Sequence, residues 1–450
     1  MGERAEWLAS GGVNRRIFNA AAAVTIASIL VKLVATFKEV TVAGVYGRSD
    51  AMDAFLAAAL IPGLLINLIS ESMNQALVPT LIRVRELEGH DRAQQLLSSA
   101  MLCTTLLLAA AAGVMGLFAR AFFPLIASHF PAAKLELSIH LFYALLPVVL
   151  LTGIAANCTA VLNMFDRFAL PALAPAVTPL AILLCASLLG ERMGIWAIVY
   201  GTLAGALIHA AWVAWMMNGH AYRFRLRWYG MTEAAREVAH QYGAMLLSSV
   251  VASGGLLVDQ SMAAMLAAGS VSALVYANRF VSVIITLLAG AVSSAVVPCF
   301  STMVAQKDWI GCRKALRTWG WLTALISTPI ALSLIAGSHL LIRIAFQRGA
   351  FGPEDTAVVT PVLAMYTIQI PFFVCSRVSY RFLVAMRRTD LIFYCGLLNL
   401  ALDIPLNLIL MRWMGVAGLA LATSLWTVST FLFLWYWARR LLRERSETAQ

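Results

Sequence analysis

Long apolar runs separated by short polar gaps occupy the chain from Ile17 to Trp437. A bilayer core about 30 Å thick requires roughly 20 apolar residues for each spanning helix. The runs therefore predict an all-α polytopic membrane protein with about 12 transmembrane helices. Their approximate positions are 17–46, 52–80, 95–118, 137–163, 169–190, 193–217, 237–266, 271–301, 317–345, 357–385, 391–411 and 415–438.

Two similar strings mark an internal repeat. Ala76-Leu-Val-Pro-Thr-Leu81 and Ala295-Val-Val-Pro-Cys-Phe300 each end a predicted span and lead into a polar stretch. A repeat of six crossings predicts two parallel six-helix lobes around a central cavity, with substrate near the midplane; the alternative is chance similarity. The expected organisation is an N-terminal lobe (1–217), a cytoplasmic inter-lobe loop (218–240), a C-terminal lobe (241–438) and a basic cytoplasmic tail (439–450).

Composition and charge placement narrow the class of protein. Apolar residues make up 61% of the 450 and charged residues only 12%, which excludes a soluble globular domain. The net charge of +11 is concentrated in alternate loops, the bias typical of cytoplasmic segments. We therefore expect a multi-pass protein of the bacterial inner (plasma) membrane with both termini cytoplasmic. The basic stretches 223–227 and 439–445 are expected to face anionic lipid head groups and not nucleic acid.

Enzymatic signatures are missing from the sequence. It contains no phosphate-binding G-x-x-x-x-G-K-[ST], no H-E-x-x-H and no evident nucleophile arrangement, so no catalytic residue is expected. The seven cysteines are scattered without a metal-ligand spacing. These observations predict a transporter and not an enzyme.

Five cations fall inside predicted spans, and they are the most informative residues of the chain. They are Lys32, Lys38, Arg279, Arg377 and Arg381. A charge at the centre of a spanning helix is costly, so such residues normally face a watery cavity or a charged partner. A cationic cavity would attract a polyanionic group such as a pyrophosphate. The alternative is snorkelling and internal salt bridges, and we favour this alternative for Arg377.

Polar oxygens inside the later spans form a second candidate site. Asp403 and Asn407 are four residues apart and share a helix face, and Thr423 and Asp259 on other spans could complete the set. Oxygen ligands suit a hard cation such as sodium, and a carboxylate alone suits a proton. The alternative is a structural role, with Pro405 kinking the helix and Asn407 joining helices.

Several motifs resemble one known family. Phe37-Lys-Glu-Val-Thr-Val-Ala-Gly-Val-Tyr-Gly-Arg-Ser-Asp-Ala-Met-Asp-Ala-Phe55, Ile61-Pro-Gly-Leu-Leu65, Gln75-Ala-Leu-Val-Pro79 and Gly269-Ser-Val-Ser-Ala-Leu-Val-Tyr-Ala-Asn-Arg279 resemble the MurJ/MviN family of lipid II flippases. That family belongs to the multidrug/oligosaccharidyl-lipid/polysaccharide exporter superfamily. The resemblance implies two six-helix lobes and translocation of a polyprenyl-pyrophosphate saccharide by alternating access.

The resemblance also implies roles for individual residues. The implied substrate-binding residues are Lys32, Lys38, Glu39, Asp53 and Arg279. The implied gate is an ion pair between Glu71 and Arg381. The implied sodium site comprises Asp259, Asp403, Asn407, Thr423 and Leu419 through its carbonyl. Sodium would be the coupling ion, and no other cofactor is expected. Lysine replaces the family's arginine at positions 32 and 38, which keeps the charge but loses the bidentate fork.

Two departures bear on the substrate. The chain ends after the twelfth predicted helix, whereas the lipid II flippases carry two more, and Ile66-Asn67 replaces an expected basic pair. A saccharide precursor of exopolysaccharide or O-antigen therefore fits as well as lipid II. The alternatives are an ion-coupled multidrug exporter and a non-transporting scaffold or transferase of polysaccharide assembly. Expected partners are the lipid-linked saccharide, membrane lipids and polysaccharide or cell-wall synthesis proteins.

Overall fold

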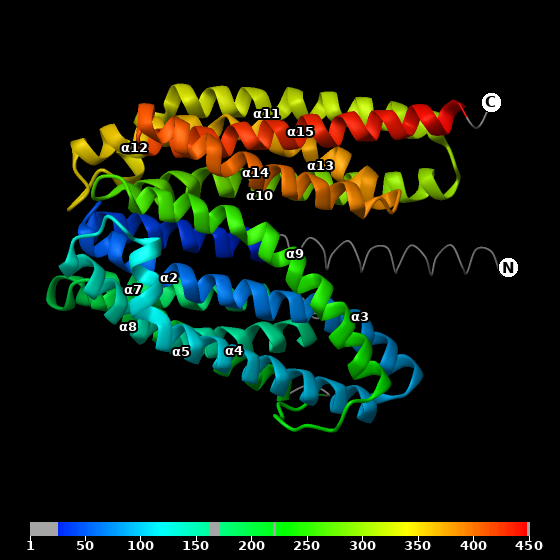
Figure 1. Ribbon diagram of the computed structural model, residues 1–450, viewed down its shortest axis with the longest axis horizontal. Coiled ribbons are helices and arrows are strands. Elements are labelled where there is room, and N and C mark those ends of the chain that lie inside the picture. The colour runs from blue at the N-terminus through cyan, green and yellow to red at the C-terminus, as the bar shows by residue number, and fades with distance from the viewer. Residues whose placement is uncertain (1–25, 163–171, 219–221, 448–450) are drawn as a thin grey trace. The chain divides into compact units, whose positions relative to one another are not determined.

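The computed structural model describes residues 26–162, 172–218 and 222–447 (Figure 1). All elements in these ranges are helical, and none is a strand. Residues 26–46 form the first described helix. The elements that follow are α2 (Asp50–Ile66), the π-helix η1 (Asn67–Glu71), α3 (Ser72–Leu87), α4 (His90–Ile126), α5 (Ala132–Leu162), the 3₁₀ turn η2 (Ala174–Ala176), α7 (Val177–Met193), α8 (Trp196–Asn218), α9 (Glu233–Ala264), α10 (Ser270–Ala305), α11 (Trp309–Phe346), α12 (Pro353–Thr367), α13 (Gln369–Ala385), α14 (Thr389–Met414) and α15 (Val416–Glu447).

The prediction of a polytopic helical membrane protein is confirmed. Within the described residues, 10 helices are long and apolar enough to cross a bilayer. They coincide with ten of the predicted spans, because helix is the conformation that satisfies all backbone polar groups within one segment. The other two predictions are the span at 17–46, which is described only from residue 26, and the span at 237–266. The latter corresponds to α9, which is not among the ten.

Two predicted single spans are built from more than one element. The span at 52–80 is α2, η1 and α3 in succession, and the span at 357–385 is α12 followed by α13. Pro62 lies inside α2, and the π-turn begins at Asn67. A π-turn changes the facing of the residues that follow it and often marks a functional segment. This irregularity begins at Ile66-Asn67, the position where the family resemblance led us to expect a basic pair.

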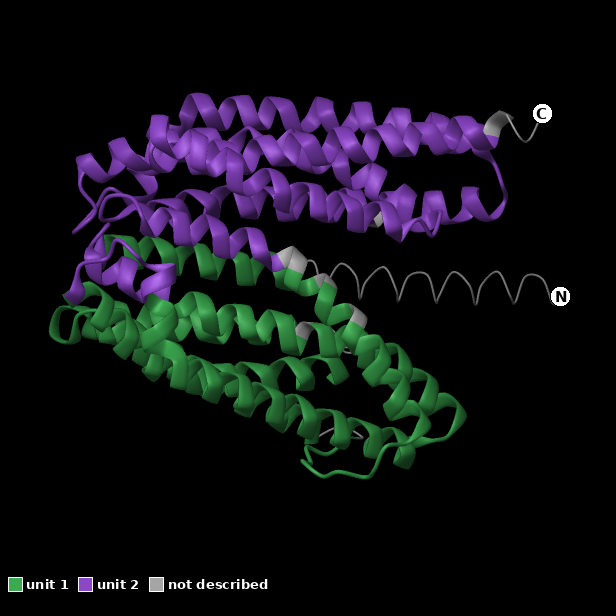
Figure 2. Ribbon diagram, in the orientation of Figure 1, with its two compact units in different colours: residues 1–45, 58–123, 133–250 green, residues 46–57, 124–132, 251–450 purple. Residues whose placement is uncertain are grey.

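The chain divides into two compact units, coloured separately in Figure 2. The first comprises residues 1–45, 58–123 and 133–250, so the unit boundary falls inside α9. Its larger core joins α3, α4, α5, α8 and α9, with Leu77, Leu97 and Val213 fully buried. Gly201 and Gly205 of α8 pack against α7, where a Cβ at Gly205 would lie 2.6 Å from the Thr178 Cα. This is the small-residue packing by which membrane helices approach closely.

The second unit comprises residues 46–57, 124–132 and 251–450. Its core joins α10, α11, α13, α14 and α15, and the rings of Phe300 and Phe382 meet edge to face at 5.4 Å. Two short segments from the first half of the sequence thus belong to the C-terminal unit. The lobe limits predicted from the repeat are contiguous, whereas these units are not.

Candidate functional site

A cation inside the first described helix has an acidic neighbour. The Lys38 ammonium donates to Glu39 Oε1 at 2.6 Å, and their side chains are 17% and 5% exposed. An ammonium has three donors, so this bond leaves the others available for a ligand. Glu39 therefore holds Lys38 in place and offsets part of the cost of its burial. Lys32, six residues earlier on the same helix, is half-buried.

Arg279, the third predicted phosphate-binding cation, lies on α10 in the second unit and is also half-buried. Lys32, Lys38 and Glu39 lie in the first unit. The convergence of these side chains on one cavity stays a prediction.

Asp53 caps the start of α10. Its carboxylate accepts hydrogen bonds from the backbone N–H of Gly269 at 2.7 Å and from that of Ser272 at 2.9 Å. Gly269 is the N-cap of α10 and has no side chain to fill this role. The first N–H groups of a helix lack intrahelical partners. Asp53, only 1% exposed, supplies the acceptors from a distant part of the sequence. Both of its oxygens are thus used in the protein.

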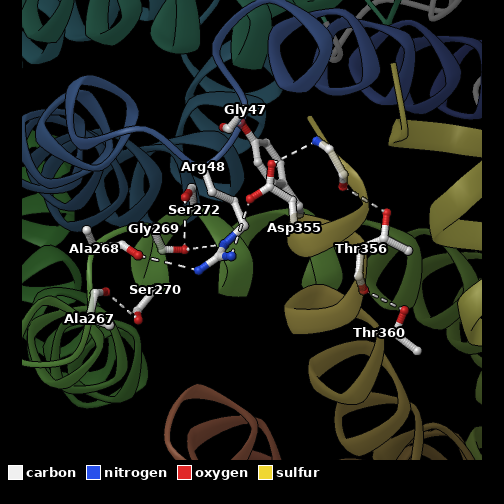
Figure 3. A network of polar contacts seen from close by, with 12 residues as sticks. Gly47, Arg48, Ala267, Ala268, Gly269, Ser270, Ser272, Asp355, Thr356 and Thr360 are labelled. Atoms are coloured by element: carbon white, nitrogen blue, oxygen red, sulfur yellow. Dashed lines mark hydrogen bonds and ion pairs between the residues drawn. The ribbon is translucent and has the colours of Figure 1, made fainter. Parts of the chain in front are cut away.

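Arg48, which was not among the predicted site residues, joins the same network (Figure 3). Its guanidinium donates to the Gly269 carbonyl at 3.0 Å, to the Ala268 carbonyl at 3.4 Å and to Asp355 at 3.3 Å. Asp355 also accepts from the Gly352 N–H at 3.0 Å and so caps α12. The turn after the first described helix is therefore joined to the starts of α10 and α12.

Two glycines make this network sterically feasible. Gly47 has φ +56°, and a Cβ there would lie 2.6 Å from the Ala350 carbonyl oxygen. Gly269 has φ +79°, and its Cβ would lie 2.7 Å from the Arg48 carbonyl oxygen. Only glycine combines these backbone angles with such close approach. The sequence signal was present in Gly47-Arg-Ser-Asp50 and in a helix start without a capping side chain of its own.

Of the two residues of the predicted gate, only Arg381 has a described side chain. The Glu71 side chain lies outside the described part of the chain, so its ion pair with Arg381 stays a prediction. Arg381 donates to the Ser293 hydroxyl at 3.4 Å and lies 5.8 Å from the Tyr380 ring centre. Arg377, one turn earlier on α13, stacks on Phe373 at 4.3 Å. Aromatic stacking of this kind stabilises a guanidinium inside a helix bundle, and it is neither the snorkelling nor the salt bridge considered from the sequence.

The predicted oxygen ligands come together in the second unit. Asn407 Nδ2 donates to Asp259 Oδ1 at 2.7 Å and to Asp403 Oδ1 at 3.0 Å. The Thr423 hydroxyl lies 3.2 Å from Asp259 Oδ2 and 3.1 Å from the Leu419 carbonyl oxygen. Three helices, α9, α14 and α15, thus bring together the five residues proposed for one site.

Two oxygens of this cluster fit a cation. Asp403 Oδ2 and Asn407 Oδ1 are buried and, within the described part of the chain, have no hydrogen-bond partner. Asp403 is 2% exposed and Asn407 is fully buried. A buried acceptor without a donor is destabilising, and two neighbouring carboxylates repel each other. A sodium ion or a proton would relieve both effects, and the donor set is the all-oxygen kind that hard cations prefer. Leucine contributes only its backbone oxygen.

Known proteins share this fold. The solved structure "Lipid II flippase MurJ, inward closed conformation" matches with a TM-score of 0.80 and 24% identity over 92% of this chain and 87% of that one. An inward-facing multidrug resistance MATE family transporter of the MOP superfamily matches with a TM-score of 0.76 and 11% identity, over 96% of this chain and 100% of its own.

Sequence comparison identifies one family more specifically than the shared fold does. A "Probable lipid II flippase MurJ" of Synechocystis sp. is 24% identical over 96% of this chain and 83% of its own length. "Lipid II flippase MurJ" of Burkholderia cenocepacia is 26% identical over 78% of this chain and 70% of its own. The profile of the family described as "Lipid II flippase MurJ" matches residues 42–448. With nearly the whole chain matched by this profile, the protein belongs to the MurJ family of lipid II flippases.

Proposed function

We propose that the protein is a flippase that moves a polyprenyl-pyrophosphate saccharide across the inner membrane, with both termini in the cytoplasm. Lipid II, or a related exopolysaccharide or O-antigen precursor, is the proposed substrate. The observation that carries the proposal is the family match over residues 42–448. The cations inside the membrane helices provide the chemistry that such a substrate requires.

The pyrophosphate is the part of the substrate that these cations would recognise. Lys32, Lys38 and Arg279 are positive charges on half-buried positions of apolar helices. In a low-dielectric setting, hydrogen bonds from charged donors to phosphate oxygens are short and strong. Glu39 orients the Lys38 ammonium without occupying all of its donors. The saccharide would follow the head group while the prenyl tail stays in lipid.

Alternating access would complete the cycle. Rocking of the two lobes would expose the bound head group first to the cytoplasm and then to the outside. The proposed gate is Glu71 with Arg381, on different halves of the chain. Any ligand shifts such an equilibrium only by its difference in affinity for the two states.

Sodium is the proposed coupling ion. Asp259, Asp403, Asn407, Thr423 and the Leu419 carbonyl would hold it, and the bound ion would supply positive charge between the two carboxylates. The two buried oxygens without donors support this assignment. The residues themselves draw α9, α14 and α15 together through the Asn407 and Thr423 hydrogen bonds. Ion binding at this site would bias the equilibrium between the two lobe arrangements.

The cations also disfavour the rival substrate. An exporter of cationic drugs needs acidic groups facing its substrate, whereas Lys32, Lys38 and Arg279 would repel a cation. This chain shares its fold with a multidrug transporter, but we do not propose that it transports the same class of substrate.

Complementation tests the proposal directly. A strain depleted of its lipid II flippase would receive this chain, and a strain lacking the chain would be assayed for accumulated lipid-linked saccharides. Rescue supports lipid II as substrate. Accumulation of another lipid-linked precursor without rescue supports the exopolysaccharide or O-antigen route. If the chain does not rescue the depleted strain and no lipid-linked precursor accumulates in its absence, the flippase assignment is refuted.

Matched variants test the cations. Lys38→Ala and Arg279→Ala should each strongly reduce transport, because loss of a charged hydrogen bond of about 1.5–3 kcal/mol lowers substrate affinity about 10- to 150-fold. Lys314→Ala and Arg343→Ala are controls that remove exposed cations from α11. Full activity of Lys38→Ala and Arg279→Ala, in protein inserted at normal levels, would contradict the proposed binding role.

A further inference from the structure

A basic pocket lies between the first turns of α11 and the last turns of α15, and it shares no residue with the proposed pyrophosphate, gate or sodium sites. It encloses about 530 Å³, including its open mouth. Its lining consists of four arginines and three apolar side chains: Arg313, Arg317, Arg439, Arg443, Leu316, Trp435 and Leu442. All seven belong to the second unit.

The spacing of the arginines explains their convergence. Arg313 and Arg317 are one turn apart on α11, and Arg439 and Arg443 are one turn apart on α15. Residues four apart share a helix face. The two helices run in opposite directions and pack together in Figure 1, so the start of α11 lies beside the end of α15. Each helix thus contributes one pair to the same pocket.

An indole ring, that of Trp435, lines the pocket between the two helices. A Cβ on Gly320 of α11 would lie 3.1 Å from the Trp435 ring, so the absence of a side chain there lets the indole lie directly against α11. The Arg439 guanidinium lies 5.3 Å from the centre of that ring. Stacking of this kind restrains an arginine while leaving its N–H donors free to bind an anion.

The charged residues that line the pocket are all of one sign. None of the seven residues is acidic. Glu444, the nearest acid along α15, bonds with Arg440 at 2.9 Å. Asp308, at the start of α11, accepts from the Gly311 N–H at 2.8 Å. Four like charges around one pocket repel each other and raise its affinity for an anion. The geometry therefore calls for an anionic ligand.

Apolar surface next to the pocket identifies the kind of anion. On α11 the four-residue steps from Arg313 and Arg317 continue to Trp321 and Leu325, which are 71% and 70% exposed. On α15 Leu432, one turn before Trp435, is 57% exposed. Large exposed apolar side chains on spanning helices contact acyl chains. An anionic head at the arginines with hydrocarbon along this stripe is the shape of a phospholipid.

We propose that this pocket binds the phosphodiester head group of an anionic phospholipid. The arginines hold the phosphate, Trp435 borders it, and the acyl chains lie along α11 and α15. Basic pockets between membrane helices are suited to such head groups. The site is separate from the proposed pyrophosphate and sodium sites, so the failure of either leaves it standing.

Native mass spectrometry of the full chain tests the proposal, with phosphatidylglycerol, phosphatidylcholine and inorganic phosphate as probes. Each arginine near an anionic head group contributes about fivefold to affinity. The double variant Arg317→Gln/Arg439→Gln should therefore weaken the tightest phosphatidylglycerol complex about 30-fold. Arg317→Lys/Arg439→Lys should retain most of the binding. The matched control Arg343→Gln/Arg412→Gln removes two exposed arginines that do not line the pocket and should change binding less than threefold.

Four outcomes would overturn the proposal. They are unchanged phosphatidylglycerol binding in the Gln double variant, an equal loss in the control, equal binding of phosphatidylcholine, and inorganic phosphate binding as tightly as phosphatidylglycerol. The last would assign the pocket to a free anion. A single size-exclusion peak for all variants and normal binding in the Lys variant separate lost binding from lost folding.

Discussion

Asp53 offers a test of whether a carboxylate acts on the substrate or on the protein itself. In the structure, the two carboxylate oxygens of Asp53 accept hydrogen bonds from the Gly269 and Ser272 N–H groups at the start of α10. Asp53→Asn replaces one acceptor by an NH₂ group that faces an N–H. Asp53→Ala removes both acceptors and leaves two buried donors without partners.

The hydrogen bonds set the expected magnitudes. A bond to a charged group contributes about 1.5–3 kcal/mol. Asp53→Asn should therefore destabilise the start of α10 by about 1.5–3 kcal/mol, and Asp53→Ala by about 3–6 kcal/mol if the two bonds add. Asp50→Asn is the matched control, since Asp50 belongs to the same turn of α2 but is exposed, and most surface substitutions stay within about 0.5 kcal/mol.

Amide hydrogen exchange measures the effect at the right place. Exchange in a peptide covering residues 265–275 should accelerate about 10- to 150-fold in Asp53→Asn and more in Asp53→Ala, with Asp50→Asn unchanged. Thermal unfolding of the purified protein should follow the same order. Unaltered exchange and melting in both variants, together with lost transport, would refute the capping role and place Asp53 among substrate-binding groups.

Three further predictions follow from other parts of the structure. Gly205→Ala should lower the melting temperature of the purified protein because its Cβ would meet α7 backbone at 2.6 Å, whereas Gly113→Ala, with nothing within 4 Å, should not; equal melting of the two would contradict the α7–α8 packing. Asp403→Asn should abolish stabilisation by sodium chloride relative to choline chloride in thermal unfolding, and sodium stabilisation of that variant would exclude the proposed ion site. A single cysteine at Glu88 should react with impermeant maleimide from the cytoplasmic side and one at His129 from the outside; the reverse pattern would invert the proposed topology.

Helix positions were predictable because length and apolarity alone determine them in a bilayer. Internal breaks were not. The sequence at 52–80 gave no sign of the π-turn at Asn67–Glu71, because such turns depend on packing with neighbouring helices and leave no composition signal. Assignment of residues 46–57 to the C-terminal unit was equally hidden, since it depends on contacts with segments over 200 residues away.

Candidate site residues differed in predictability for a similar reason. The spacing of Asp403 and Asn407 alone places them on one helix face. In the structure, Asn407 Nδ2 lies 3.0 Å from Asp403 Oδ1. Asp259 comes from another helix, so the sequence could name it only as a candidate to complete the set, and the family resemblance supported that choice. Asp53 was assigned to substrate by resemblance, and its capping of α10 requires knowing which helix start lies opposite. Sequence shows that α10 lacks a cap of its own but not which distant residue supplies one.

The cap on α10 has a consequence for how the protein can be divided. Asp53 and Arg48 are made long before Gly269 emerges from the ribosome, so the acceptors and donors for the start of α10 are already present when that helix inserts. A gene split in the loop at 218–240 would produce a second fragment that contains α10 without them. We expect that fragment to be degraded when expressed alone and rescued by co-expression of the first, so the two halves are interdependent in biogenesis as well as in transport.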